Sequence, residues 1–419
     1  MTKVLLIGNG AREHAIAAAL ARSDVEILAH MDKMNPGIAS LASETSINTL
    51  MDSRKLPDTT GIDYAVVGPE GPLSVGVVDY LISKGIQCIG AVQEAARIET
   101  NKSFARRILD DVAKIANPKY VAARSVDALK KFEDSVGVEN VVVKPDGLSG
   151  GKGVKIFGDH FDNRDDLEKY AITLLSKHGI VILEEKLIGT EFTVQAFVDG
   201  TSLELMPLVR DYKRAYDDDK GPNTGSMGSY SKANHMLGYV TDEDLTTASD
   251  IMLKTVIGIK KRTKLDYKGI LYGQFMKTDK GIKVIEFNAR FGDPEAMNVL
   301  SLLTTSLDDV FQSIIDGQVI KPDFEKKATV CLYIVPDGYP GPDVAQDSPI
   351  SLIPGIDSEV YYASVYDQEG VMHTTGSRAL GLLAKGDTVE EARSIVYKDA
   401  ERVNGKIRFR SDIAKGVEE

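Results

Sequence analysis

The sequence has little cysteine, no excess of basic charge and no long apolar run, and each shortage excludes a class of protein. Its two cysteines, Cys88 and Cys331, lie far apart in apolar stretches, which excludes a zinc cluster and argues against a disulfide framework. The 50 Lys and Arg residues against 62 Asp and Glu give a net charge of -12, which argues against nucleic-acid and anionic-membrane partners. No stretch approaches the roughly 18 apolar residues that a membrane span needs.

The remaining composition is typical of a globular protein that acts on small molecules. Its 419 residues suggest about three domains. The first residues, Met1–Gly8, form a short apolar run that leads directly into glycines, unlike a signal peptide, so we expect a cytoplasmic protein. The six histidines show no close pairing and are not expected to bind metal. No exposed apolar seam is evident in the sequence, so we expect a monomer.

The order of the apolar runs predicts an α/β protein. Over residues 1–100, short apolar strands such as Val4–Ile7 alternate with helical patterns such as Arg12–Arg22, which predicts a parallel sheet with right-handed crossovers. Residues 101–327 open with a helical pattern and then become rich in strands, while residues 328–419 combine strands with one amphipathic helix. We therefore expect domain boundaries near residues 100 and 327.

A first glycine cluster follows the first predicted strand. The segment Gly8–Glu13 opens a helix, and backbone N–H groups at a helix N-terminus can hold a phosphate. A dinucleotide-binding fingerprint would need glycine where Glu13 stands, so hydride transfer is not favoured. A tight strand–helix turn without a ligand remains the alternative. Glu70 follows a later strand at the same sheet edge, where it could accept hydrogen bonds from sugar hydroxyls.

A second glycine cluster, Lys144–Gly153, joins two predicted strands. It is not a P-loop, because Gly147 and Lys152 are too close and Gly153 stands where a Ser or Thr would hold magnesium. The cluster predicts a flap that closes over a polyphosphate and offers it backbone N–H groups and lysine charge. Lys144 supports this interpretation, because a lysine within an apolar strand is costly unless it meets an anion. A flexible surface hairpin is the alternative.

The strand pattern Lys283–Phe287 leads into the other informative segment. Alternate residues of a strand share a face, so Glu286, Asn288 and Arg290 are expected to point together. Carboxylate and amide oxygens suit Mg²⁺, and Arg290 could stabilise charge on a transferring phosphoryl group. Gln274, on the preceding strand, could offer a third oxygen. An exposed polar strand face is the alternative.

Together these motifs resemble the ATP-grasp superfamily, and within it the phosphoribosylamine–glycine ligase family. The segments Gly221–Gly225 and Phe287–Glu295 are specific to that family, and the resemblance runs almost end to end. It implies a pre-ATP-grasp parallel-sheet domain, an ATP-grasp domain in which residues 119–190 form a mobile lid, and a small C-terminal α+β domain. It also implies ATP-dependent joining of glycine to 5-phosphoribosylamine through a glycyl phosphate, with release of ADP and phosphate, in de novo purine synthesis.

The resemblance implies roles for individual residues. The ligands of Mg²⁺ or Mn²⁺ would be Glu286, Asn288 and Gln274. Arg290 would stabilise phosphoryl or acyl-phosphate charge, and Asp293 would orient an attacking or ammonium nitrogen. The residues expected to bind ATP are Lys102, Lys144, Gly147, Gly150, Gly151, Gly153, Glu184, Glu185, Leu187 and Glu191. The residues expected to bind the other substrates are Gly10, Arg12, Glu13, Glu70, Asp211 and Lys213.

Some positions depart from the family pattern and leave the contacts of the 211–230 loop open. The family commonly has other residues at Ala11, Pro145, Tyr212, Ser226 and Ser377. Two other functions stay possible at this point: another ATP-grasp carboxylate–amine ligase, or a nucleotide-binding regulator without turnover. The retained Lys144, Glu286, Asn288 and Arg290 argue against the regulator. Within the loop, Asp217–Gly221 is expected to be mobile.

Overall fold

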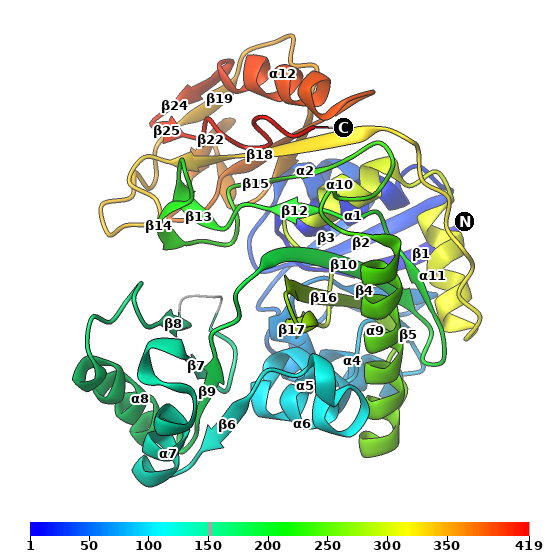
Figure 1. Cartoon of the computed structure of the whole chain (residues 1–419). Helices are drawn as coiled ribbons and strands as arrows, with labels where there is room; N and C mark the ends of the chain where they lie inside the picture. The colour runs from blue at the N-terminus through cyan, green and yellow to red at the C-terminus, as the bar shows by residue number, and fades with distance from the viewer. Residues whose placement is uncertain (150–152, 419) are drawn as a thin grey trace.

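The computed structural model describes residues 1–149 and 153–418, which form an α/β protein with a separate lid lobe (Figure 1). In Figure 1 the lid lies at the lower left and the C-terminal sheet at the top, with the N-terminal sheet and a central sheet between them. Among the described residues, no helix combines the length and apolar character required to span a bilayer.

The first lobe is a parallel sheet, which confirms the predicted fold class. Its central strands are short apolar runs such as Val4–Ile7, which is fully buried, as expected where helices cover both faces of a parallel sheet, while the edge strand Glu44–Ile47 is mostly exposed. They pair in the order β3-β2-β1-β4-β5. The strands are β1 (Thr2–Ile7), β2 (Val25–Met31), β3 (Glu44–Ile47), β4 (Tyr64–Val67) and β5 (Gln87–Ile89). The helices are α1 (Ala11–Leu20), α2 (Pro36–Leu41), α3 (Glu70–Ser74), α4 (Val77–Ser83) and α5 (Gln93–Thr100).

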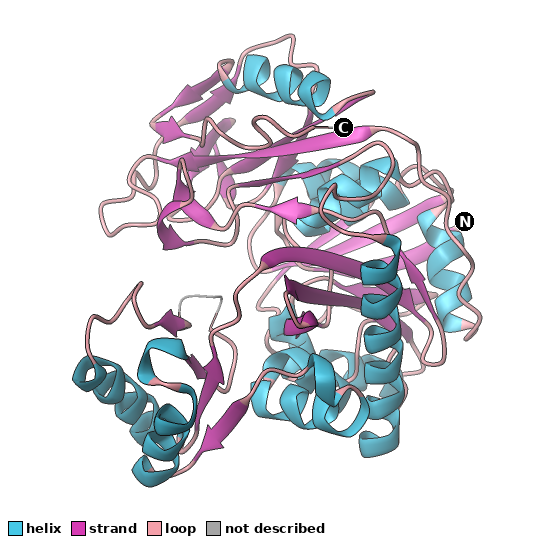
Figure 2. Ribbon diagram, in the orientation of Figure 1, coloured by secondary structure: helices cyan, strands magenta, loops and turns pink. Residues whose placement is uncertain are grey.

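The lid is a four-stranded antiparallel sheet covered by two helices (Figure 2). It has a hydrophobic core of its own, which includes Leu129, Phe132, Val143, Leu167 and Leu183. A lobe with a separate core can move as a unit. Its strands pair in the order β6-β9-β7-β8. The elements are β6 (Tyr120–Ala123), α7 (Val126–Val136), β7 (Val141–Pro145), β8 (Lys155–Ile156), α8 (Arg164–His178) and β9 (Val181–Glu185).

The central sheet carries the strand that was predicted to bind metal. It is antiparallel, in the order β11-β10-β16-β17. A reciprocal cap begins the long helix α9, because the Thr241 hydroxyl accepts the Asp244 N–H while the Asp244 carboxylate accepts the Thr241 N–H. The elements are α6 (Lys102–Val112), β10 (Thr190–Val198), β11 (Leu203–Leu205), α9 (Asp242–Thr263), β16 (Gly269–Thr278), β17 (Gly281–Asn288), α10 (Glu295–Leu302) and α11 (Leu307–Ile315). Short 3₁₀ turns lie at Ser53–Lys55, Lys114–Ala116 and Val138–Asn140.

The C-terminal sheet takes in strands from the middle of the chain. Its order is β12-β15-β18-β23-β20, so two short strands from the expected 101–327 domain pair within the sheet of the expected 328–419 domain. The division at residues 100 and 327 stays a prediction. The elements are β12 (Arg210–Asp211), β13 (Arg214–Tyr216), β14 (Lys220–Asn223), β15 (Gly228–Ser231), β18 (Ala328–Pro336), β19 (Ile350–Leu352), β20 (Glu359–Tyr362), β21 (Val365–Gln368), β22 (Val371–Thr374), β23 (Leu380–Gly386), α12 (Val389–Ala400), β24 (Val403–Gly405) and β25 (Ile407–Arg408).

His14 joins the N-terminal lobe to the C-terminal sheet. Its Nδ1 accepts the backbone N–H of Tyr362 at 3.0 Å, and its ring stacks on the Tyr362 ring. The ring also fills the space beside Gly37, where an added Cβ would lie 2.0 Å from His14 Cε1. Burial lowers the pKa of His14 to about 4, because the charged imidazolium would lose its hydration.

We expect His14 to make the fold acid-sensitive. A lowered pKa means that the unfolded chain binds the proton more readily, so this stabilisation is complete above pH 6.5 and is lost as pH falls toward 4. Between pH 7 and pH 4 the free energy of unfolding should fall by about 3 kcal/mol more in the unsubstituted chain than in His14→Gln. Urea unfolding across that range measures the difference, with exposed His178→Gln as the control. Identical pH slopes for the unsubstituted chain and His14→Gln would contradict this expectation.

Candidate active site

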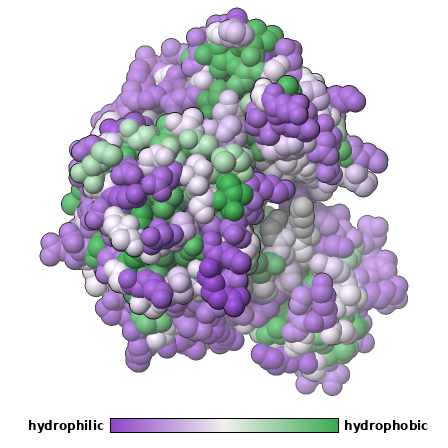
Figure 3. Space-filling model, turned by 180° about the vertical axis from the view of Figure 1, so that it is seen from behind, coloured by the Kyte–Doolittle hydropathy of each residue, from purple (hydrophilic) through white to green (hydrophobic). Residues whose placement is uncertain are grey.

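The surface is hollowed between the lid and the rest of the molecule, as the view from behind shows (Figure 3). Three buried charged groups connect the lid to the rest of the molecule. Lys144 Nζ of β7 lies 2.6 Å from one oxygen of Glu184 on β9. Arg106 of α6 donates two hydrogen bonds to the same carboxylate, at 2.6 and 2.8 Å. Arg106 also donates to the carbonyls of Val284 and Ile285, so this cluster ties the lid to β17, the strand that was predicted to bind metal.

Glu184 is ionised in this cluster. Burial alone would raise its pKa, but Arg106 and Lys144 outweigh burial and lower the pKa to about 2. Lys144 therefore finds the anion that its place in an apolar strand requires. Sequence reasoning missed Arg106, although a charged residue on the buried face of an amphipathic helix was a usable signal.

The base of the glycine-rich hairpin is tied to the start of α6. The Asp146 carboxylate accepts the Ser103 N–H at 2.6 Å and the Asn101 side-chain N–H at 2.8 Å. Lys102 Nζ donates to the Gly147 carbonyl at 2.9 Å. Burial lowers the pKa of Lys102, while Glu286 and other nearby acids oppose that effect.

β7 and β8 form the predicted hairpin, with Val142 opposite Ile156. Gly153 lies close to Pro145, because an added Cβ would lie 2.7 Å from Pro145 Cγ. Gly150 and Gly151, which were predicted to bind ATP, lie outside the described residues. The lid also touches the β13–β14 hairpin, where Arg214 lies 3.0 Å from Asp159.

The predicted metal-ligand residues come together on β16 and β17. Gln274 pairs directly with Glu286 across the two strands. The Gln274 side-chain amide donates to Glu191 Oε2 at 2.6 Å, which leaves its own oxygen available. Asn288 Oδ1 accepts a hydrogen bond from Arg290 at 3.1 Å. Within residues 1–149 and 153–418, no cluster of three or more His, Cys, Asp and Glu side chains could hold a metal ion.

One carboxylate and two amide oxygens fit a magnesium-like ion that takes most of its ligands from phosphates and water. Glu286 is the anionic member of this set. Burial would raise its pKa, but Lys213, Lys144, Lys102 and Arg290 together lower it, so Glu286 is a carboxylate facing cations. Such an arrangement of charges suits an anion that binds together with a cation.

Arg290 is held by two acids of the N-terminal lobe. Its Nη2 lies 2.9 Å from Glu99 Oε1, and its Nε lies 3.3 Å from Glu70 Oε2. Burial would raise the pKa of Glu70, but Arg290 and Arg12 lower it to about 2. Glu99 also accepts the Ala289 N–H at 2.7 Å, so it holds the backbone next to Asn288. Burial raises the pKa of Glu99 to about 7, and sequence reasoning missed this residue.

The first glycine cluster is built around Glu13. Its carboxylate accepts the Gly10 N–H at 2.7 Å and pairs with Arg12 Nε at 2.6 Å. A Cβ at Gly68 would lie 2.2 Å from Glu13 Oε1, so the bulk of Glu13 requires glycine there. Arg12 also lies 4.0 Å from Glu70, so these predicted substrate residues do form one group. The Gly10 N–H is already satisfied within the chain.

Asp293 is engaged by the C-terminal sheet. Arg378 Nη2 lies 2.9 Å from one of its oxygens, and the Tyr333 hydroxyl donates to the other. Arg378 also stacks on the Tyr333 ring, 4.2 Å from its centroid. Arg378 follows Ser377, one of the positions that depart from the family pattern, and sequence reasoning missed it.

A group of acids surrounds Lys213. Its Nζ lies 3.8 Å from Glu191 Oε2, and Asp211, Glu286 and Glu295 act on it electrostatically. Glu295, which sequence reasoning missed, accepts a hydrogen bond from Tyr272 at 3.0 Å, and burial raises its pKa to about 7. Burial also raises the pKa of Asp211, against the opposing effect of Lys213.

The remaining predicted nucleotide residues lie where the lid meets the central sheet. Glu185 ends β9, and its Oε1 accepts the Lys119 N–H at 2.8 Å. Leu187 is half-buried in the segment that leads to β10. Glu191 is exposed on β10, and its carbonyl accepts a hydrogen bond from Tyr239. Ser226, where the family commonly has glycine, has a left-handed backbone with φ of 87°.

Known proteins resemble the chain along nearly its whole length. Models of phosphoribosylglycinamide synthetase match it with the N domain at residues 2–99, the ATP-grasp (A) domain at 100–296 and the C domain at 329–416. Two curated relatives are phosphoribosylamine–glycine ligases. That of Methanobrevibacter smithii is 45% identical and that of Methanoregula boonei 46%, each over 98% of this chain and 96% of its own length.

Solved structures agree with this assignment. The phosphoribosylamine–glycine ligase of Thermotoga maritima has a TM-score of 0.83 at 27% identity, and the match covers 98% of this chain and 100% of that one. A Campylobacter jejuni biotin carboxylase, solved as a complex with β,γ-ATP, has a TM-score of 0.74 at 14% identity over 97% of this chain and 92% of its own, and shares the fold. The chain therefore belongs to the phosphoribosylglycinamide synthetase family.

Proposed function

We propose that this chain joins the carboxylate of glycine to the amine of 5-phosphoribosylamine at the expense of ATP. The products are glycinamide ribonucleotide, ADP and phosphate, and the reaction is a step of de novo purine synthesis. One observation carries the proposal: Glu286 faces four cations, which are Lys102, Lys144, Lys213 and Arg290. One carboxylate among four cations suits a metal-bound polyphosphate. We take the particular reaction from the family to which the chain belongs.

The chemistry requires an activated glycine. A carboxylate is a poor electrophile, so transfer of the terminal phosphoryl group of ATP gives glycyl phosphate, and attack by the amine then expels phosphate. Enzymatic phosphoryl transfer depends mainly on positioning and charge stabilisation. A divalent cation, Mg²⁺ or Mn²⁺, bound by Glu286, Asn288 and Gln274 would neutralise phosphate charge. Arg290 stabilises the charge that develops on the transferred group.

The residues around this centre bind and orient the substrates. Lys102 and Lys144 contact the phosphates of ATP. The backbone of the 184–187 segment faces adenine, because the Glu184 carboxylate is occupied by Arg106 and Lys144. Glu191 accepts the ribose hydroxyls, and Asp293, oriented by Arg378, faces the reacting nitrogen.

The other substrates lie toward the N-terminal lobe and the 211–213 segment. Arg12 and Glu70, supported by Gly10 and Glu13, hold phosphoribosylamine, and Asp211 and Lys213 complete the pocket. Residues 119–190 close over the nucleotide and exclude water, which matters because an acyl phosphate hydrolyses readily. The proposal includes a protein that acts as a monomer. It also places the protein in the cytoplasm, because the charged substrates do not cross membranes unaided.

An omission assay tests the proposal. Purified protein with Mg·ATP, glycine and freshly made phosphoribosylamine should release ADP, and leaving out either glycine or phosphoribosylamine should reduce release to background. ADP release that is equally fast without glycine would overturn the proposal. Release with another acid or amine, but not with this pair, would instead identify a different carboxylate–amine ligase.

A further inference from the structure

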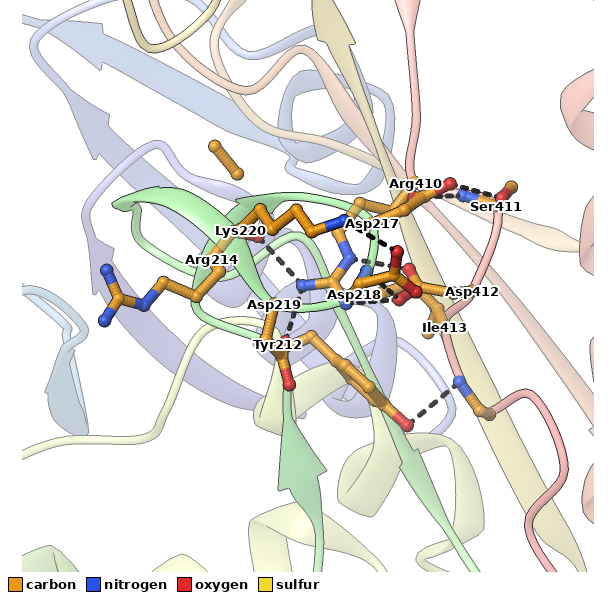
Figure 4. A network of polar contacts seen from close by, with 12 residues as sticks. Tyr212, Arg214, Asp217, Asp218, Asp219, Lys220, Arg410, Ser411, Asp412 and Ile413 are labelled. Atoms are coloured by element: carbon orange, nitrogen blue, oxygen red, sulfur yellow. Dashed lines mark hydrogen bonds and ion pairs between the residues drawn. The ribbon is translucent and has the colours of Figure 1, made fainter.

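The C-terminal segment 408–414 is bonded to the β13–β14 hairpin through a buried arginine (Figure 4). Arg410 is 1% exposed, so its charge must be compensated inside the protein. Its Nε and Nη2 donate to the two oxygens of Asp412, at 2.8 and 2.7 Å. Its Nη1 donates to Asp219 at 2.9 Å and to the Arg214 carbonyl at 3.0 Å. This forked geometry is specific to a guanidinium.

The tip of the hairpin is held by the same segment. The Asp217 carboxylate accepts the N–H of Ser411 at 2.9 Å and also its hydroxyl. The Asp218 N–H donates to Asp412 at 2.9 Å. Asp218 and Asp219 both have left-handed backbones, with φ of 57° and 51°. These hydrogen bonds and the Arg410–Asp219 ion pair join Asp217–Gly221, which was expected to be mobile, to a segment distant in the sequence, and its mobility stays a prediction.

Lys213 lies between two residues that this segment holds. On one side, the Tyr212 hydroxyl accepts the Ala414 N–H at 3.1 Å, and the Tyr212 ring lies 5.1 Å from the Arg410 guanidinium. On the other side, Arg410 binds the Arg214 carbonyl. The Lys213 carbonyl itself accepts the Thr224 N–H at 2.8 Å. The backbone of Lys213 is therefore fixed in place from both directions.

The Lys213 side chain points into the candidate active site. Its ammonium lies 3.8 Å from Glu191, the proposed ribose contact. Among the cations that lower the pKa of Glu286, the proposed metal ligand, Lys213 has the largest effect. Coulomb energy varies with distance, so a shift of Lys213 by a few ångströms would change the attraction that it exerts on a bound polyphosphate.

We propose that Arg410 is a positioning residue which, from outside the active site, holds Lys213 where its ammonium attracts the phosphates of the nucleotide. The inference rests on the proposed function, because it requires a nucleotide to bind beside Glu191 and Glu286. The hydrogen bonds of Arg410 go to Asp412, Asp219 and the Arg214 carbonyl, none of which is proposed to bind substrate, so the inference places the effect of its substitution at Lys213.

A double-mutant cycle on Mg·ADP binding tests the inference, with dissociation constants from isothermal titration calorimetry. We expect Lys213→Ala to weaken binding by about tenfold and Arg410→Lys by about threefold, while Arg410→Lys has no further effect in the Lys213→Ala background. Losses that multiply in the double variant would show an effect independent of Lys213 and would overturn the inference. Unchanged binding in either single variant would also overturn it. Failure of the unsubstituted chain to bind Mg·ADP would instead overturn the proposed function itself.

A second pair of variants keeps the test decisive if Arg410→Lys does not fold. Asp219→Asn removes the hairpin charge that Arg410 Nη1 binds and leaves Arg410 paired with Asp412, and asparagine tolerates the left-handed backbone of this position. Asp218→Asn is the matched control, because it is the same change at the preceding left-handed position, where the side chain pairs with exposed Lys220. Asp219→Asn should speed amide hydrogen exchange at residues 212–223 and weaken Mg·ADP binding, while Asp218→Asn should do neither. Equal behaviour of the two variants would contradict the inference.

Discussion

Replacing Glu286 with glutamine is expected to lower kcat by at least about tenfold at saturating Mg²⁺, a loss of about 1.4 kcal/mol of transition-state stabilisation. Glutamine keeps the size of the side chain and one oxygen, but it removes the negative charge that faces Lys213, Lys144 and Lys102. Without that charge the proposed metal site would hold its cation less firmly, and the phosphates that the cation aligns would lose their alignment. Steady-state kinetics at several Mg²⁺ concentrations measures both effects.

The control for this experiment is Glu243→Gln, the same change at an exposed position in the first turn of α9. Its kcat and KM should match those of the unsubstituted chain. If Glu286→Gln also kept both constants at saturating Mg²⁺, Glu286 would have no part in the reaction, and the site on β17 would have to be abandoned.

The largest expected effect on stability comes from Glu184→Gln. Glu184 is 3% exposed and its carboxylate lies between Arg106 and Lys144, so the substitution leaves two buried cations without the anion that compensates their charge. Breaking a buried ion pair from one side costs about 3 to 5 kcal/mol. We therefore expect the free energy of unfolding to fall by about 3 kcal/mol or more, measured by urea denaturation near pH 7.

The lowered pKa of Glu184 fixes the pH dependence of this effect. The stabilisation is present above the ordinary pKa near 4.5 and is lost as pH falls toward 2, so the two proteins should converge in acid. Glu94→Gln is the control, because Glu94 pairs with Arg97 on an exposed helix face, where an ion pair contributes at most about 0.5 kcal/mol. A Glu184→Gln variant as stable as Glu94→Gln would show that the cluster does not hold the lid to the central sheet.

Local patterns predicted the parts of the fold that depend on near neighbours in sequence. The apolar run Val4–Ile7 before Gly8 predicts a buried parallel strand, and the structure has one. The glycine-rich hairpin after β7 and the alternation of Glu286 and Asn288 likewise follow from strand geometry. Each of these features is fixed by residues only a few positions apart.

Contacts between distant segments could not be predicted in this way. Arg106 meets Glu184, and Glu99 meets Arg290, only because the folded chain brings α6 to β9 and α5 to β17. Nothing local to Asp217–Gly221, a run of acids and glycine that predicts mobility, indicates that Arg410 will bond to it. The membership of β15 in the C-terminal sheet depends likewise on its pairing with β18 across about a hundred residues, and β12 joins the sheet by pairing with β15.

The proposed chemistry is tested most directly by following the oxygens of glycine. With glycine labelled by oxygen-18 in its carboxylate, the reaction should transfer one labelled oxygen to each phosphate released, because the phosphate leaves from glycyl phosphate. Mass spectrometry of the phosphate, together with the yield of glycinamide ribonucleotide, makes the measurement. Phosphate without label in a reaction that consumes ATP would show that the glycine carboxylate is never phosphorylated and would contradict the account.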